Sequence, residues 1–320
     1  MESATAPARA RVSWWRNLAE SRRALAVVLI APAVLFILLV VGVPLVWAIY
    51  LSLTDAIGGS LTGNFVGLDN FTHAWGDANF RKALQNTLVF TFGSQAIVLV
   101  GAALLSHQLV KEFRGKWILR MLVVLPWAAP VALGTLGWLW IFDSLFSVIN
   151  WTAGHPIDWV LGFVGIDLVD PINPPQWLGR ANLALIAVIM VHAWRVLPFA
   201  VVIFIAGLAS IPTEVDDAAK IDGADGLKKM WWVTLPLQLP IALVALLFGI
   251  VFTAADFTVV FLLTGGGPFN ATQMLTTWSF QIGINSGSLG EGAAISLYLF
   301  PLLAAVSIAM LWFARRAQVS

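Results

Sequence analysis

Six long apolar stretches constrain the fold of this 320-residue chain more than any other feature of its sequence. A helix needs about 20 consecutive apolar residues to cross the hydrocarbon core of a bilayer, and each stretch is that long. Charged residues make up 11% of the chain, against roughly 25% in a soluble domain. We therefore predict an all-α, polytopic membrane protein with six transmembrane helices. The predicted spans are residues 24–50, 84–109, 117–142, 181–209, 237–263 and 293–313.

The segments between the predicted spans are too short to form a separate domain. One transmembrane domain is predicted over residues 24–316, between an N-terminal tail of residues 1–23 and a C-terminal tail of residues 317–320. The first apolar run is too long for a signal-peptide core, so we predict a retained span. A further apolar piece at residues 159–169 is too short to span and is predicted to lie at the membrane interface. The net charge of +1 predicts no nucleic-acid partner, and the absence of cysteine excludes disulfides and thiol chemistry.

Lysine and arginine residues are distributed unequally between the two sides of the predicted spans. If the N-terminus is cytoplasmic, 14 of the 18 basic residues lie on the cytoplasmic side. Positive charge accumulates in the cytoplasmic segments of membrane proteins. We therefore predict that both termini are cytoplasmic, together with the polar segment between the fourth and fifth spans.

That polar segment, residues 211–236, forms a charged island between two apolar runs. Pro212 and Thr213 are suited to begin a helix, and the Thr213 hydroxyl can cap it. Acidic residues early in that helix suit the positive end of its dipole. Gly223 can end the turn, because glycine adopts a positive φ at little cost. We predict a short rigid helix–turn–helix outside the bilayer; an ordinary polar loop is the simpler alternative.

The spacing within the island follows a specific pattern. Asp217-Ala218-Ala219 is followed after three residues by Gly223, and after nine more by Val233-Thr234-Leu235-Pro236. This spacing resembles the EAA loop of ATP-binding-cassette importer permeases, whose pattern is E-A-A, three residues, G, nine residues and I-x-L-P. Asp217 stands where the family has glutamate and Val233 where it has isoleucine, and both substitutions keep charge or shape.

Four further segments narrow this resemblance to one branch of the family. They are Asn86-Thr87-Leu88, Leu125-Pro126-Trp127, Ile221-Asp222-Gly223-Ala224 and Leu263-Thr264-Gly265-Gly266-Gly267-Pro268. These segments resemble the carbohydrate permeases, in particular the first member of the permease pair in maltose-type transporters. The chain lacks the extra amino-terminal spans and the large outer domain of the enteric maltose permease, so contacts made by those parts cannot be carried over.

The resemblance implies the type I importer permease fold, multi-pass placement in a bacterial or archaeal cytoplasmic (inner) membrane, and a set of partners. Cytoplasmic ATPase subunits would dock on the island as a coupling loop, a second related permease would complete the pathway, and an extracytoplasmic sugar-binding protein would deliver a carbohydrate. ATP and Mg²⁺ are expected to bind the ATPase subunit. We expect no cofactor in this chain, because it has no G-x-x-x-x-G-K-[ST] sequence. The candidate coupling residues are Glu214, Asp216, Asp217, Ala218, Ala219, Asp222 and Gly223.

Two charged residues lie well inside predicted spans, Arg195 in the fourth and Asp256 in the fifth. A charge at that depth costs at least ~2.5 kcal/mol on insertion scales, so each should have a partner or face a cavity. The two could form a structural ion pair, or one or both could line the substrate path. His192 and Trp194 flank the same region, and an aromatic ring beside hydrogen-bonding groups suits a sugar ring. We therefore treat all four as candidate substrate-pathway residues.

Two other classes of protein are compatible with the apolar spans. An ion-coupled secondary transporter could use Arg195 and Asp256. Inverted repeats or broken spans would favour that class, and the sequence shows neither. A membrane-embedded enzyme would need a catalytic constellation. The four histidines lack metal-ligand spacing, and the sequence contains no recognisable nucleophile–base motif. We therefore predict an importer permease with no metal site and no catalytic residues of its own.

Overall fold

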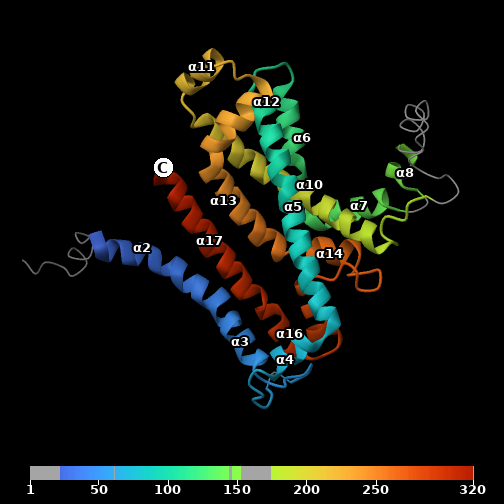
Figure 1. Ribbon diagram of the computed structural model, residues 1–320. Helices are drawn as coiled ribbons and strands as arrows, with labels where there is room; N and C mark the ends of the chain where they lie inside the picture. The colour runs from blue at the N-terminus through green and yellow to red at the C-terminus, as the bar shows by residue number, and fades with distance from the viewer. Residues whose placement is uncertain (1–21, 61, 144–145, 153–173, 320) are drawn as a thin grey trace, which may run out of the picture. The chain divides into compact units, whose positions relative to one another are not determined.

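Helices make up all the regular structure in the part of the chain that the computed structural model describes, residues 22–60, 62–143, 146–152 and 174–319 (Figure 1). One isolated β-bridge joins Thr54 and Phe65. The piece at residues 159–169, predicted to lie at the membrane interface, is outside the described residues. The chain divides into two units, residues 1–50 and 51–320, which are described separately.

The first unit contains the first predicted span. Helix α2 (Arg22–Ile37) continues through a π-helical turn, η1 (Leu38–Gly42), into α3 (Val43–Ser52). Within them, Arg23–Ser52 is a continuous helix of 30 residues with an 18-residue stretch whose mean hydropathy is 3.2. A helix of that length and composition can cross a bilayer, which agrees with the span predicted at residues 24–50.

The second unit is built around two long helices, α5 (Ala78–Val110) and α10 (Ala181–Ala209), which pack against each other. Small side chains lie in this contact and let the helices approach closely; they include Ala102, Ala193, Ala200 and, from α13, Ala245. Helix α13 (Leu235–Ala254) packs on both. Helices α16 (Leu289–Leu297) and α17 (Leu299–Val319) form the last span. The second, fourth and sixth predicted spans are therefore confirmed.

The third predicted span is not one straight helix. Helix α6 (Lys116–Ala128) and helix α7 (Val131–Ile141) meet at an angle of 101°. The break falls at Ala129 and Pro130, where Ala129 has the extended backbone (φ −72°, ψ 144°) that a following proline favours. With this bent pair counted as one span, the described residues contain six segments long and apolar enough to cross a membrane; otherwise they contain five.

The fifth predicted span, residues 237–263, is also broken, which corrects the sequence-based expectation. Helix α13 ends at Ala254, and the short helix α14 (Thr258–Leu263) begins after a gap of three residues. Asp256 lies in the gap, where its Oδ1 accepts a hydrogen bond from Val259 N at 2.9 Å. The carboxylate thus satisfies an amide at the start of α14 and favours a break inside an apolar run.

The remaining elements are short. They are α4 (Asp69–Gly76), α8 (Val148–Thr152), α11 (Thr213–Ile221), α12 (Gly226–Lys229), α15 (Leu275–Phe280) and the π-helical turns η4 (Met230–Thr234) and η5 (Gln281–Asn285). The glycine-rich segment after α14 is a tight turn, with Gly265 and Gly266 at φ of 59° and 88°. The segment that follows this turn contains α15 and η5.

A close backbone contact between α16 and η5 leads to a stability prediction. A Cβ on Gly292 would lie 2.7 Å from Gly283 N and still nearer to its Cα. Backbone atoms cannot turn aside as a side chain can, so Gly292→Ala should cost about 1–3 kcal/mol by overpacking. The melting temperature of the purified protein should fall. Gly137→Ala is the matched control, because a Cβ there meets nothing within 4 Å. Equal melting temperatures for both variants would contradict the contact.

Candidate functional site: a charged loop and a cavity between the helices

Helix α11 occupies the centre of the charged island. It begins at Thr213, with Pro212 in the cap position and no side chain capping it. Thr213 is therefore the first helical residue, which corrects its predicted capping role. Asp222 follows the helix, and Gly223 has a φ of 72°. The left-handed turn predicted at Gly223 is confirmed.

The two alanines of the motif lie in different surroundings. Ala219 is buried, and so is Ala224 after the turn, so this side of α11 packs against the chain itself. Ala218 is exposed, as are Glu214, Asp217 and Asp222 in the same segment. The small surface open to an approaching partner is therefore at Ala218, while Ala219 holds the helix in place.

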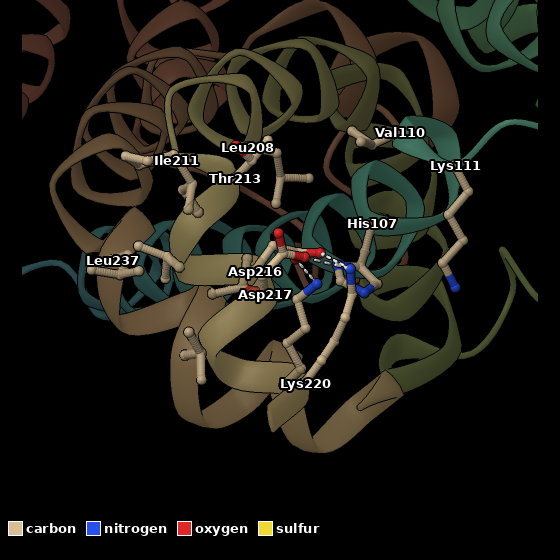
Figure 2. A pocket seen from close by; sticks show the side chains of 15 residues that line it. His107, Val110, Lys111, Leu208, Ile211, Thr213, Asp216, Asp217, Lys220 and Leu237 are labelled. Atoms are coloured by element: carbon tan, nitrogen blue, oxygen red, sulfur yellow. Dashed lines mark hydrogen bonds and ion pairs between the residues drawn. The ribbon is translucent and has the colours of Figure 1, made fainter. Parts of the chain in front are cut away.

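Ion pairs connect α11 to the segment that leads into α13. Lys220 Nζ lies 3.1 Å from Asp216 Oδ2 and 3.1 Å from Asp217 Oδ1. Asp216 Oδ1 also pairs with Lys229, at the end of α12 (Figure 2). The Asp217 side chain is 71% exposed, against 39% for Asp216. Asp216 is thus the more enclosed of the two carboxylates, and Asp217 is the more exposed.

A cavity of about 480 Å³ lies behind α11 (Figure 2). Its walls come from the ends of α5 and α10, from α11 and from the start of α13. The residues labelled in the figure are His107, Val110, Lys111, Leu208, Ile211, Thr213, Asp216, Asp217, Lys220 and Leu237. Sequence reasoning missed this cavity, because the end of α5 is about a hundred residues away in the chain and no local pattern connects the two.

The two charges inside the spans form an ion pair. Arg195 Nη2 lies 3.1 Å from Asp256 Oδ2, and the Asp256 side chain is 4% exposed against 23% for Arg195. His192 is on the other side of the carboxylate, with Nδ1 3.6 Å from the same oxygen. Trp194 does not join this group; its ring packs edge-on against Trp138 of α7 at 5.5 Å. Three of the four predicted pathway residues therefore lie together.

A second cavity, of about 450 Å³, lies beside Arg195. Aromatic rings from α6, α10 and α13 line it: Trp127, Phe199 and Phe252. Their centroids are 6.0 Å apart for Trp127 and Phe199, and 5.8 Å apart for Phe199 and Phe252. The sequence has 16 tryptophans and 20 phenylalanines, so no spacing distinguished these three. The cavity combines an arginine with stacking surfaces, an arrangement suited to a polar ring-shaped ligand.

Comparison with known proteins identifies the family. Residues 98–319 match the family described as the binding-protein-dependent transport system inner membrane component, and the chain belongs to it. The chain is 30% identical over 293 residues to the sulfoquinovosyl glycerol transport system permease protein SmoG of Agrobacterium fabrum, covering 90% of each. It is 28% identical over 283 residues to the trehalose/maltose transport system permease protein MalF of Thermococcus litoralis, covering 88% of this chain and 91% of that one.

Solved structures agree on the fold. A bacterial ABC transporter involved in the import of the acidic polysaccharide alginate has a chain that matches with a TM-score of 0.74. The identity is 17%, and the match covers 95% of this chain and 98% of the other. The protein is therefore a multi-pass membrane permease of the type I importer fold, and its role is in transport.

Proposed function

We propose that this chain is one of two related permease subunits of an ATP-driven importer that takes up a carbohydrate. The aromatic cavity beside Arg195 is the observation that supports a carbohydrate substrate. The faces of Trp127, Phe199 and Phe252 can pack on the apolar face of a sugar ring. The Arg195 guanidinium offers donors that Asp256 does not fully use, and these can bind a sugar hydroxyl or an acidic group. Relatives named for sulfoquinovosyl glycerol and for trehalose and maltose support this substrate class.

Helix α11 is the proposed contact with the ATPase. Glu214, Asp217, Ala218 and Asp222 would face the partner, because they are exposed. Asp216, Ala219 and Gly223 would maintain the shape of the loop through an ion pair, burial and a positive φ. Closure of two ATPases on nucleotide would draw the docked loops together and switch the cavity between inward- and outward-facing states. An extracytoplasmic binding protein would deliver the sugar.

One observation favours a second candidate, an ion-coupled secondary transporter. Helix α13 breaks at Asp256, and broken helices with buried charges are common at ion sites of such proteins. Membership of the binding-protein-dependent family favours the importer. The two are separated by purifying the tagged protein from its host and testing for a bound ATPase whose hydrolysis rises with sugar-loaded binding protein. Uptake by this chain alone in vesicles, driven by an ion gradient, would overturn the importer.

The proposed orientation can be tested independently. Both termini and α11 should be cytoplasmic, because 14 of the 18 basic residues then lie on that side. A cysteine tag fused after Ser320 should react with a membrane-impermeant maleimide only after the cells are opened. The chain has no cysteine of its own, so the untagged protein is a clean control. Labelling of the tag in intact cells would show that the C-terminus lies outside and that the proposed orientation is wrong.

A further inference from the structure

A buried polar chain crosses three helices behind Asp256. Its centre is Thr253 of α13, whose Oγ1 lies 2.7 Å from Gln95 Nε2 of α5 and 3.0 Å from His192 Nε2 of α10. All three side chains are buried. A Cβ on Gly249 would collide with the Gln95 amide, so glycine leaves room for that side chain. Buried polar groups inside a membrane are costly and are often functional.

The hydrogen bonds of Thr253 determine which nitrogen of His192 carries a proton. The Thr253 hydroxyl has one proton, which it donates to the Gly249 carbonyl at 2.7 Å. With that proton donated to the Gly249 carbonyl, the oxygen accepts from both other neighbours, the Gln95 amide and His192 Nε2–H. A neutral His192 consequently carries its proton on Nε2 and a lone pair on Nδ1.

That lone pair faces a carboxylate. His192 Nδ1 is 3.6 Å from Asp256 Oδ2 and has no hydrogen-bond partner. Arg195 Nη2 is 3.1 Å from the same oxygen. While Nδ1 is unprotonated, its lone pair repels the carboxylate, and Asp256 is held by Arg195. A proton on Nδ1 would turn His192 into a second charged donor that competes for this oxygen.

We propose that His192, held by Thr253 and Gln95, is a positioning residue that adjusts how strongly Asp256 holds Arg195. The proposal rests on the proposed role of Arg195 in the sugar site. A proton taken from water by Nδ1 lets the imidazolium donate to Asp256, and the Arg195 guanidinium then turns more of its donors to the substrate. Loss of that proton returns Arg195 to the carboxylate. Protonation of His192 therefore favours substrate binding.

Among the described residues, the charged groups that act on His192 are Asp256 and Arg195. Arg195 lies on the same helix, and Asp256 approaches from the break after α13. The Phe90 ring of α5 packs edge-on against the imidazole at 4.9 Å and carries no charge. Thr253 contributes only its hydroxyl. Among the described residues that contact His192, any dependence on pH therefore passes through Asp256 and Arg195.

The test compares wild-type protein with His192→Gln, whose amide can still donate to Thr253 but does not titrate. Sugar-stimulated ATP hydrolysis of the complete transporter is measured in proteoliposomes between about pH 5.5 and 8, a range that brackets the ordinary imidazole pKa. The half-maximal concentration of sugar-loaded binding protein should fall several-fold towards low pH in wild type and stay flat in the variant. Parallel pH profiles would overturn the proposal.

A second pair of variants covers the case in which His192→Gln fails to assemble. Thr253→Val removes the acceptor that fixes the imidazole proton and should flatten the profile, while Thr253→Ser keeps the hydroxyl and should match wild type. Identical pH profiles for Thr253→Val and Thr253→Ser would contradict the role of Thr253. Absence of sugar stimulation in wild type at every pH would instead refute the proposed function. Stimulation with parallel profiles would refute this inference alone.

Discussion

Replacing Ala218 with tryptophan is expected to release the ATPase from the permease or to uncouple hydrolysis from uptake. Ala218 is exposed on α11 beside Asp217, so an indole there would occupy the space that a docking partner needs. Poor packing at a formed interface costs about 1–3 kcal/mol, and 1.4 kcal/mol corresponds to about a tenfold loss of affinity. Copurified ATPase and sugar-stimulated hydrolysis should both be measured, because either the contact or the coupling can fail.

The control for this experiment is Ala218→Ser, which changes the volume little and should behave as wild type. Insertion of all variants should be normal, since no span is altered. A second substitution acts through the backbone: Gly223 has a φ of 72°, so Gly223→Val should strain the turn by about 1 kcal/mol or more. Full ATPase retention and normal coupling in both Ala218→Trp and Gly223→Val would show that α11 is an ordinary connector.

Replacing Arg195 with methionine is expected to abolish sugar-dependent uptake. The guanidinium is partly exposed at the aromatic cavity, and truncating one partner of a hydrogen-bonded charge pair typically costs about 2–5 kcal/mol. The single variant also leaves Asp256 buried without its cation, which is destabilising by about 3–5 kcal/mol. Loss of uptake in Arg195→Met alone could therefore reflect folding, and yield must be measured beside transport.

The double variant Arg195→Met/Asp256→Asn separates the two causes. It removes both charges together, so folding yield should recover while uptake stays lost. The exchange variant, with Asp at 195 and Arg at 256, tests a purely structural pair. We expect no rescue of uptake, because Asp256 Oδ1 also accepts the Val259 amide and an arginine cannot. Normal uptake in the double variant would remove Arg195 and Asp256 from the substrate path.

The parts of the fold that the sequence predicts are those encoded locally. An apolar run long enough to span a bilayer is visible in the sequence, and so is the 217–236 spacing that led to α11 and Gly223. The pairing of Arg195 with Asp256 could be predicted from the free-energy cost of placing a charge inside a membrane, because two isolated charges in apolar spans need partners. The bend after α6 lies next to Pro130, a residue type that favours kinks, but an angle of 101° depends on packing.

The parts that the sequence could not predict depend on contacts between distant segments. The aromatic cavity needs Trp127, Phe199 and Phe252, which come from three helices and look like ordinary span residues. Gln95 and Thr253 were not singled out, because single polar residues in apolar runs are usually satisfied by their own helix. The break at Asp256 was missed because the run around it is apolar, and only the hydrogen bond to Val259 reveals a helix start.

The ion pair between Asp216 and Lys229 has a mechanical consequence. Lys229 directly precedes η4, which continues into α13 to give a rod of 25 residues, Met230–Ala254. At 1.5 Å per residue such a rod is about 37 Å long. Its far end reaches Asp256, which holds Arg195. If α11 binds the ATPase and Arg195 binds the sugar, as proposed, then α13 connects the two sites, because its start is held to α11 by the Asp216–Lys229 ion pair and its end leads to Asp256. A displacement of α11 would then reach the cavity beside Arg195 through one helix.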